Sequence, residues 1–311
     1  MDGQPAPQPV ANFALILVCL GLGVALRISG RMPEGAHLTL NAVIVNVALP
    51  ALAFASVRTL SFDAALLFAV AMPWLVFAFG AGFFLLVSHA LGFNRSTTGG
   101  LVLTGALGNT SFVGLPMIEI FFGREAMQVG LVIDQLGSYL VLSTLGLVAA
   151  AAFSGTRATP AEMIGRLVRF PPLLALGAAL LCAGMPIPPW MDAMLMRLAD
   201  TIPALAMLSV GYQLRFAALA GNRSALAVGL GFKLVLVPFL IAPLYLGLLP
   251  ETMHATARIA IFESAMAPMI GAGIVAMQYK LNAPLVSLML GIGIPLSLMT
   301  VPAWWYALGA V

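Results

Sequence analysis

Long apolar runs divide the chain, and each run ends at a short polar or Gly/Pro-rich connection. A helix needs about 20 apolar residues to cross the hydrocarbon core of a bilayer. The runs are continuous and do not alternate over about ten residues, as the strands of a membrane β-barrel do. The pattern therefore predicts an all-α polytopic membrane protein with ten transmembrane helices, at residues 11–28, 37–57, 63–92, 96–121, 126–153, 165–184, 190–216, 223–248, 252–279 and 283–308.

Composition narrows the class of protein. Of the 311 residues 61% are hydrophobic and 8% are charged, whereas a soluble protein carries about a quarter charged residues. So few charges could not solvate a soluble surface, which excludes a cytosolic enzyme. The net charge of +3 comes from dispersed basic residues, so it gives no sign of nucleic-acid binding. The partner that the composition implies is the lipid bilayer.

The basic residues predict an orientation. Lys and Arg concentrate in the odd-numbered connections between spans, which include Arg95, Arg166 and Lys280. The positive-inside rule makes these connections cytoplasmic. We therefore expect a multi-pass protein of a bacterial inner (plasma) membrane with both termini on the non-cytoplasmic side.

A repeated segment predicts two related halves. The sequence P-A-L-A-F-A-S-V at 50–57 recurs as P-A-L-A-M-L-S-V at 203–210, about half the chain later. Pro116 and Pro268 are separated by nearly the same interval. We expect residues 1–155 and 156–311 to form two five-helix repeats. An odd number of spans inverts the second copy, and inverted repeats are typical of secondary transporters.

The fourth and ninth spans are interrupted by glycine, proline and polar residues. Proline removes a backbone donor and clashes with the preceding turn. Unwound backbone survives at membrane depth only where it lines a cavity or is buried in protein. Broken helices at equivalent places in two halves point to a transport site. The alternative for either helix alone is a kink with close packing of small residues.

These segments resemble the auxin efflux carrier family, which includes the plant PIN-FORMED carriers and bacterial carriers of malonate and related acids. The resemblance is clearest in the N-T-x-x-x-G-L-P pattern of residues 109–116. It also lies in N-V-A-L-P-A-L at 46–52, E-S-A-M-A-P at 263–268 and the closing run 286–302. It covers essentially the whole chain.

The resemblance implies a fold and a mechanism. The fold has two inverted five-helix repeats with broken, crossing helices 4 and 9, and is more distantly similar to that of bile acid/sodium symporters. Substrates of the family are small organic anions, moved by an elevator-like swing of one domain. Helices 1, 2, 6 and 7 would form the scaffold, and helices 3–5 and 8–10 the transport domain. The scaffold would support a homodimer.

The chain departs from the plant pattern in two ways. The connection at 154–164 is short, whereas plant members carry a long regulatory segment there. The ninth span has no amide that would mirror Asn109. Regulation by phosphorylation and auxin itself as the substrate are therefore not implied.

Substrate ligands are expected around the two breaks. The amide of Asn109 can donate to a carboxylate, although Asn is also a favoured helix N-cap. A half-helix N-terminus beside it would add N–H groups and a positive dipole end. The predicted substrate-binding residues are Asn109, Thr110, Ser111, Pro116, Pro268 and Asn46.

Ion or proton coupling is expected at polar residues deep in the spans. A carboxylate in a membrane helix is expensive, so Asp134 and Glu263 should face the interior, pair, or bind a proton. Each could equally form a structural pair. Lys233 could neutralise a carboxylate, attract the substrate, or snorkel to the membrane surface. The predicted coupling residues are Asp134, Glu263, Gln135 and Lys233.

The remaining predictions concern chemistry that the chain lacks. No His or Cys spacing suggests a metal, and no nucleotide-binding loop or nucleophile–base frame is recognisable. We expect no cofactor beyond a coupling proton or sodium ion, and no enzyme activity. The expected function is secondary-active transport of small organic anions. A sodium-coupled symporter and a ligand sensor built on a transporter fold are the alternatives.

Overall fold

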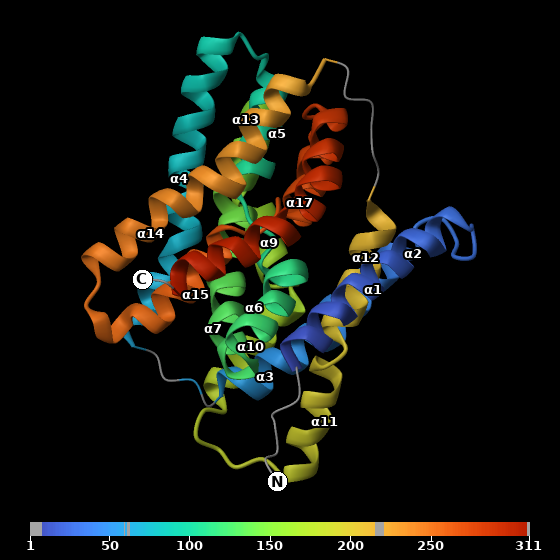
Figure 1. Cartoon of the computed structure of the whole chain (residues 1–311), viewed down its shortest axis with the longest axis vertical. Helices are drawn as coiled ribbons and strands as arrows, with labels where there is room; N and C mark the ends of the chain where they lie inside the picture. Colours follow the sequence, from blue (N-terminus) through green and yellow to red (C-terminus); the bar gives the residue numbers. More distant parts are fainter. Residues whose placement is uncertain (1–7, 59, 61–62, 215–220, 310–311) are drawn as a thin grey trace. The chain divides into compact units, whose positions relative to one another are not determined.

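The computed structural model describes residues 8–58, 60, 63–214 and 221–309 (Figure 1), with the side chains from residue 14 onward. Within this part of the chain the secondary structure is entirely helical, apart from one isolated backbone bridge. Among the described residues, six helical segments are long and apolar enough to cross a membrane: 36–57, 64–91, 124–154, 189–213, 223–248 and 283–309. The protein is therefore an all-α polytopic membrane protein. Ten crossings remain a prediction, and the chain ends lie outside the described residues.

The helices follow the apolar runs closely, and several spans contain turns of different helical types. The segment 124–154, for example, passes through 3₁₀, α and π turns without a break. The elements are α1 (Gln8–Ile28), α2 (Ala36–Val43), η1 (Ile44–Ala48), α3 (Leu49–Val57), α4 (Ala64–Leu91), α5 (Arg95–Ala106), η2 (Thr110–Gly114), α6 (Leu115–Phe122), η3 (Arg124–Ala126), α7 (Met127–Val132), η4 (Ile133–Tyr139), η5 (Leu142–Gly146), α8 (Leu147–Ser154), α9 (Pro160–Leu167), α10 (Pro171–Leu181), α11 (Pro189–Ala199), α12 (Ile202–Gln213), α13 (Arg223–Gly231), η6 (Phe232–Leu236), α14 (Val237–Leu248), η7 (Glu251–Met253), α15 (His254–Ser264), α16 (Ile270–Gln278) and α17 (Ala283–Gly309).

The chain divides into two compact units, each assembled from both halves of the sequence. Unit 1 contains residues 1–60, 111–128 and 170–214, and therefore α1–α3, α6 and α10–α12. Unit 2 contains residues 61–110, 129–169 and 215–311, and therefore α4, α5, α8, α9 and α13–α17.

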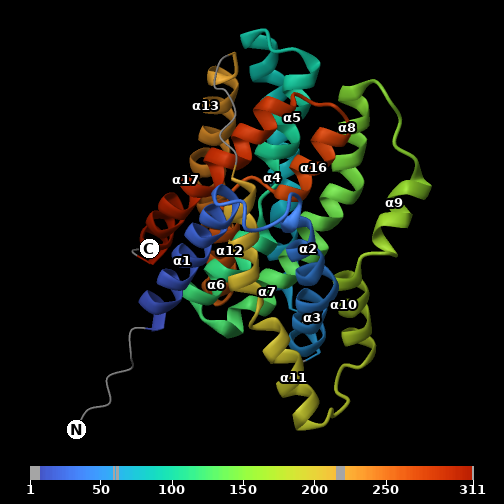
Figure 2. The same cartoon turned by 90° about the vertical axis from the view of Figure 1, so that its right-hand side faces the viewer.

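Unit 1 is organised around the contact of α1 with α12, which lie side by side in Figures 1 and 2. Their backbones approach at Gly23 and Gly211, because a Cβ on Gly23 would lie 2.3 Å from the Leu208 carbonyl oxygen. The Tyr212 hydroxyl also donates to the Pro33 carbonyl oxygen at 2.8 Å. Small residues allow such close contacts between membrane helices.

The repeated sequence segments form comparable elements within unit 1. Residues 50–57 lie in α3 and residues 203–210 lie in α12, and each helix has a proline in its first turn. Proline suits the start of α12, because the first N–H groups of a helix have no partner within the helix. Pro50 instead follows the π turn η1 inside the continuous segment 36–57. The two copies thus share a helical conformation as well as a sequence.

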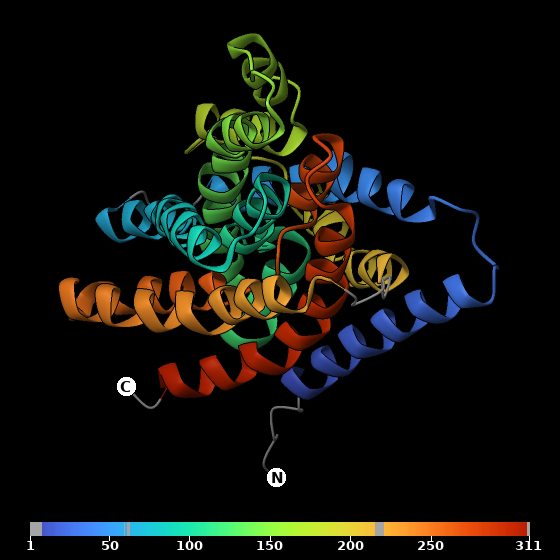
Figure 3. The same ribbon diagram turned by 90° about the horizontal axis from the view of Figure 1, so that it is seen from above.

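Unit 2 has a continuous core of long helices. Helix α15 packs against α4. The orange α14 passes close to the cyan α4 (Figure 3), where the Tyr245 hydroxyl on α14 donates to the Phe68 carbonyl oxygen at 2.6 Å. Phe84 stacks edge-on against Phe232, with ring centroids 4.8 Å apart. These contacts join α4 to α14 and η6, and α4 also packs against α5, η4 and α15. Helix α4 is thus the common neighbour of the segments that carry the polar groups described next.

Candidate functional site

Two helix breaks meet inside unit 2. The helix α5 ends at Ala106 and helical structure resumes at Thr110, while α15 ends at Ser264 and α16 begins at Ile270. The Asn109 N–H donates to the Ala267 carbonyl oxygen at 2.8 Å, and the Met269 N–H donates to the Leu107 carbonyl oxygen at 3.0 Å. We call these joined breaks, residues 107–109 and 265–269, the crossover.

The crossover gives hydrogen-bond partners to backbone groups that lie outside regular helix in both segments. Extended backbone in a buried position needs hydrogen-bond partners from elsewhere in the protein. Gly108 and Pro268 face each other between the two hydrogen bonds, as in an antiparallel bridge. Pro268 has no N–H, so it brings no extra donor that would need a partner. Each break therefore supplies one backbone donor and one backbone acceptor to the other.

Close packing on α17 holds Pro268 in place. Pro268 is buried, and a Cβ on Gly293 would lie 2.8 Å from its Cδ atom. The absence of a side chain at Gly293 thus makes room for the proline ring. From the break onward, α16 presents its first-turn N–H groups toward the crossover, and such groups favour negative charge.

Polar side chains gather directly beside the crossover. Asn109 is 2% exposed and Thr110 is 1% exposed. The Thr110 hydroxyl donates to an Asp134 carboxylate oxygen at 2.5 Å. The Gln135 amide donates to the other oxygen of the same carboxylate at 2.6 Å. Each oxygen of the Asp134 carboxyl group therefore accepts a hydrogen bond from a neighbouring side chain.

The π-helical turn η4 presents this carboxylate. Two contacts with α4 position the turn: the Trp74 indole donates to the Leu136 carbonyl oxygen at 3.1 Å, and a Cβ on Gly137 would lie 2.7 Å from the Pro73 ring. Inserted π turns are frequent at functional sites because they rotate side chains out of regular register.

A second polar group comes from η6 and α15. Lys233 is 1% exposed, and its ammonium donates to the Ser264 carbonyl oxygen at 2.9 Å. Glu263 is fully buried and directly precedes Ser264 in α15. Within the described part of the chain, neither carboxyl oxygen of Glu263 has a hydrogen-bond partner. A buried carboxyl with no donor is unusual.

The structure therefore brings seven of the ten predicted site residues into unit 2 around one crossover: Asn109, Thr110, Asp134, Gln135, Lys233, Glu263 and Pro268. The other predicted residues, Ser111, Pro116 and Asn46, belong to unit 1. Ser111 is half-buried in η2 and Pro116 is buried in the first turn of α6. Asn46 is exposed, and its amide donates to the Ala42 carbonyl oxygen of its own helix at 2.8 Å.

Two groups that contact Lys233 beside the crossover could not be recognised from residue type. The Ser264 contribution is a backbone carbonyl, which no side-chain pattern reveals. Gly108 matters because it lacks a side chain: a Cβ there would lie 3.0 Å from the Lys233 nitrogen. The glycine adjoining Asn109 was the available signal, but glycines are common throughout this chain.

Comparison with known proteins finds a family and relatives that match nearly the whole chain. The family model described as membrane transport protein matches residues 10–305. An uncharacterized transporter of Methanothermobacter thermautotrophicus is 27% identical over 293 residues, which cover 93% of this chain and 95% of the relative. An uncharacterized transporter of Methanocaldococcus jannaschii is 25% identical over 316 residues, covering 97% and 99%.

The chain belongs to the membrane transport protein family. The family match confirms the resemblance to auxin efflux carriers on which the sequence analysis relied. As a member of this family, the protein is a multi-pass transporter and not an enzyme.

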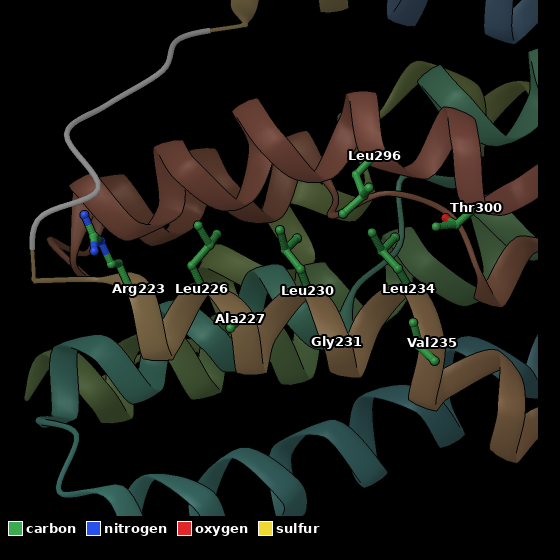
Figure 4. A pocket seen from close by; sticks show the side chains of 9 residues that line it. All are labelled: Arg223, Leu226, Ala227, Leu230, Gly231, Leu234, Val235, Leu296 and Thr300. Atoms are coloured by element: carbon green, nitrogen blue, oxygen red, sulfur yellow. The ribbon is translucent and has the colours of Figure 1, made fainter.

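An apolar groove on another face of unit 2 has a different character. Leu226, Leu230 and Leu234 of the α13–η6 segment face Leu296 of α17 across it (Figure 4). Its volume is about 440 Å³, and Arg223 is the charged residue in its lining. For a membrane transport protein, such a wall suits lipid chains better than a polar substrate.

Proposed function

We propose that the protein is a secondary-active transporter of small organic anions, in the class of mono- or dicarboxylates and auxin-like weak acids. The substrate binds at the crossover. The observation that carries this proposal is the pair of helix breaks hydrogen-bonded to each other beside buried Asn109. Irregular backbone at membrane depth is typical of transporter binding sites.

The chemistry of the crossover suits a carboxylate. The Asn109 amide can donate to one carboxylate oxygen, and the first turn of α16 supplies N–H groups and a positive dipole end. The Thr110 hydroxyl donates its one hydrogen to Asp134. Thr110 therefore positions the backbone of the site and does not donate to the substrate. Pro268 shapes the break opposite Gly108.

The proposed mechanism is an elevator. Unit 1 contains α1–α3 and α10–α12, which match the proposed scaffold of helices 1, 2, 6 and 7, together with α6. Unit 2 contains the crossover and the remaining spans except residues 111–128, which include the second half of the predicted fourth span. We propose that unit 2 carries the substrate while unit 1 stays fixed and forms the homodimer contact. Ten helices in two inverted repeats, with both termini outside the inner membrane, complete the proposal.

A thermal-shift experiment on purified full-length protein tests the substrate class. The probes are acetate, malonate and indole-3-acetate, each at several pH values with and without sodium. A ligand that binds only the folded state raises the melting temperature by mass action. We expect at least one acid to stabilise the wild type and to leave Asn109→Ala unshifted.

Asn222→Ala is the matched control, because Asn222 is an amide bonded to Asn282 away from the crossover. It should keep the wild-type response to the acid. Asn46→Ala measures whether the second predicted amide contributes. If no acid shifts the wild type, the organic-anion proposal is wrong. A shift that requires sodium would replace it with a sodium-coupled symporter, and binding without flux in vesicles would favour a sensor.

A further inference from the structure

The ends of two helices at the crossover carry an inference about Lys233, which rests on the proposed function. Helix α5 ends at Ala106 and α15 ends at Ser264, so both bring their C-terminal carbonyl groups to the crossover. The C-terminal end of a helix carries partial negative charge on carbonyls that lack a partner within the helix. In transporters with broken helices, such ends hold the coupling cation, for example sodium. The crossover therefore offers a place that attracts a cation.

The last turn of α15 shows where this cation comes from. The carbonyl oxygens of Ile261, Phe262 and Glu263 accept hydrogen bonds from neighbouring residues of the same segment. The next carbonyl, that of Ser264, accepts its hydrogen bond from the Lys233 ammonium at 2.9 Å. Ser264 is buried, and a buried carbonyl without a donor costs free energy. Lys233 thus completes the hydrogen bonding of the helix end.

The same ammonium lies beside the end of α5. A Cβ on Gly108, two residues beyond the last residue of α5, would lie 3.0 Å from the Lys233 nitrogen. It would also lie 3.5 Å from the Glu263 carbonyl oxygen. The positive charge is therefore placed where the C-terminal ends of the two broken spans come together.

The structure separates the interpretations that the sequence left open for Lys233. The side chain is 1% exposed, so it does not reach toward a membrane surface. Within the described part of the chain, no hydrogen bond joins it to the adjacent Glu263 carboxyl. Its partner is a backbone carbonyl at a helix end, which is the kind of ligand that a coupling cation has in other transporters.

We propose that the Lys233 ammonium takes the place of a coupling cation at the joined ends of α5 and α15. Binding of the organic anion at the crossover therefore needs no sodium ion. Lys233 is a positioning residue in this proposal: it acts on the substrate through the backbone and the electric field of the crossover.

The directions of the helices give the physical reason. The first turn of α16 favours an anion, whereas the C-terminal ends of α5 and α15 disfavour one at nearly the same place. A positive charge on the Ser264 carbonyl offsets the unfavourable ends and leaves the favourable end of α16 to act on the substrate. The N-cap residue of α16, Met269, makes no side-chain cap, so a bound carboxylate can take that role.

Calorimetry of the wild type tests the independence from sodium. Acetate, malonate and indole-3-acetate are titrated as choline salts into the detergent-purified full-length protein. The buffer contains about 100 mM sodium chloride or the same concentration of choline chloride, so that the ionic strength is constant. A coupled cation would change the Kd of the acid by the coupling factor. We expect the two Kd values to agree within about twofold.

Two substitutions of Lys233 separate its charge from its volume. Lys233→Met keeps most of the side chain without the charge, and the Kd of the acid should rise about tenfold. Lys233→Ala vacates the place of the cation and should lose affinity in the same way. Sodium or n-propylammonium should then improve the binding of the acid to Lys233→Ala by about threefold or more. Neither cation should improve binding to Lys233→Met, because the methionine side chain fills the space.

Arg223→Gln is the matched control, because it removes an exposed cation from the first turn of the same span. It should bind the acid as the wild type does, with no response to either cation. The melting temperature of each variant without ligand shows whether it folds, and the sodium test on the wild type does not depend on any variant.

The outcomes distinguish this inference from the proposed function. A wild type that binds the acid more tightly in sodium would overturn the inference and make sodium the coupling ion. Wild-type affinity in Lys233→Met, or a loss in folded Lys233→Ala that neither cation reduces, would overturn it and leave the crossover as the substrate site. Failure of every acid to bind the wild type would instead reject the proposed function together with the inference.

Discussion

The Thr110 hydroxyl donates to an Asp134 carboxylate oxygen at 2.5 Å, and both groups are buried. This bond links the residue that follows the crossover to the π-helical turn η4. Asp134 therefore acts on the crossover through Thr110, which holds the backbone of the break in place. The carboxylate is structural support for the site as well as a source of charge.

Replacing Thr110 by valine should destabilise the protein through this carboxylate. The substitution keeps the shape of the side chain and leaves Asp134 with one donor fewer. A hydrogen bond to a charged group contributes about 1.5–3 kcal/mol, so the melting temperature should fall by several degrees.

Thr104→Val is the matched control for this loss. Thr104 is equally buried, but its hydroxyl donates to the neutral Gly100 carbonyl oxygen of its own helix at 2.6 Å. A neutral bond contributes about 1 kcal/mol. Equal losses in the two variants would show that Thr110 has no special relation to the Asp134 charge.

The sequence predicted the helices well because their signal is local. Apolar run length and Gly/Pro punctuation depend on neighbouring residues alone, and the ends of α4 and α17 lie close to the predicted spans 63–92 and 283–308. Position in the chain paired Pro116 with Pro268, but the structure places Pro116 in the first turn of α6 and sets Pro268 opposite Gly108. The polar and glycine residues around Asn109 did indicate where the fourth span breaks. The direct meeting of the two breaks through the Asn109 N–H and the Ala267 carbonyl is a tertiary contact.

The polar contacts could not be derived in the same way. Lys233 had three interpretations from sequence, since its partner is the Ser264 carbonyl and every residue has a carbonyl. The π turn η4 rotates Asp134 away from the register of a regular helix, so a face assigned from an α-helical period would be wrong. Long-range packing decides both features.

Gly293 should tolerate no side chain, because it supports the crossover from α17. An added Cβ would lie 2.8 Å from the Pro268 Cδ atom, and overpacking costs about 1–3 kcal/mol. We expect Gly293→Ala to lower the melting temperature and to reduce anion binding. Gly231→Ala, where an added Cβ meets nothing within 4 Å, should do neither. Unchanged binding in Gly293→Ala would mean that the crossover does not need this packing.

The α1–α12 contact predicts that alanine substitutions at two glycines of α1 change the stability of the protein differently. In Gly23→Ala the new Cβ would lie 2.3 Å from the Leu208 carbonyl oxygen, while in Gly21→Ala it meets nothing within 4 Å. Rigid backbone cannot move aside cheaply, so Gly23→Ala should lose about 1–3 kcal/mol. Gly21→Ala should be neutral or slightly stabilising, because alanine favours helix. Thermal unfolding of the two variants side by side measures the difference.

Lys280 and Asn282 are the non-glycine residues with positive φ in the described chain, at 57° and 34°. Left-handed backbone costs a non-glycine residue about 1–2 kcal/mol, and the exposed Lys280 forms its hydrogen bonds through its backbone. Lys280→Gly should therefore stabilise the protein by about 0.5–1 kcal/mol after the entropy of the unfolded glycine is subtracted.

Asn282→Gly relieves the same strain, but it removes the side-chain bonds to Thr97 at 2.7 Å, to Asn222 at 3.1 Å and to the Leu285 N–H at 3.2 Å. That variant should melt below the wild type. A common direction of change in the two melting temperatures would show that these side-chain bonds do not hold α5, α13 and α17 together.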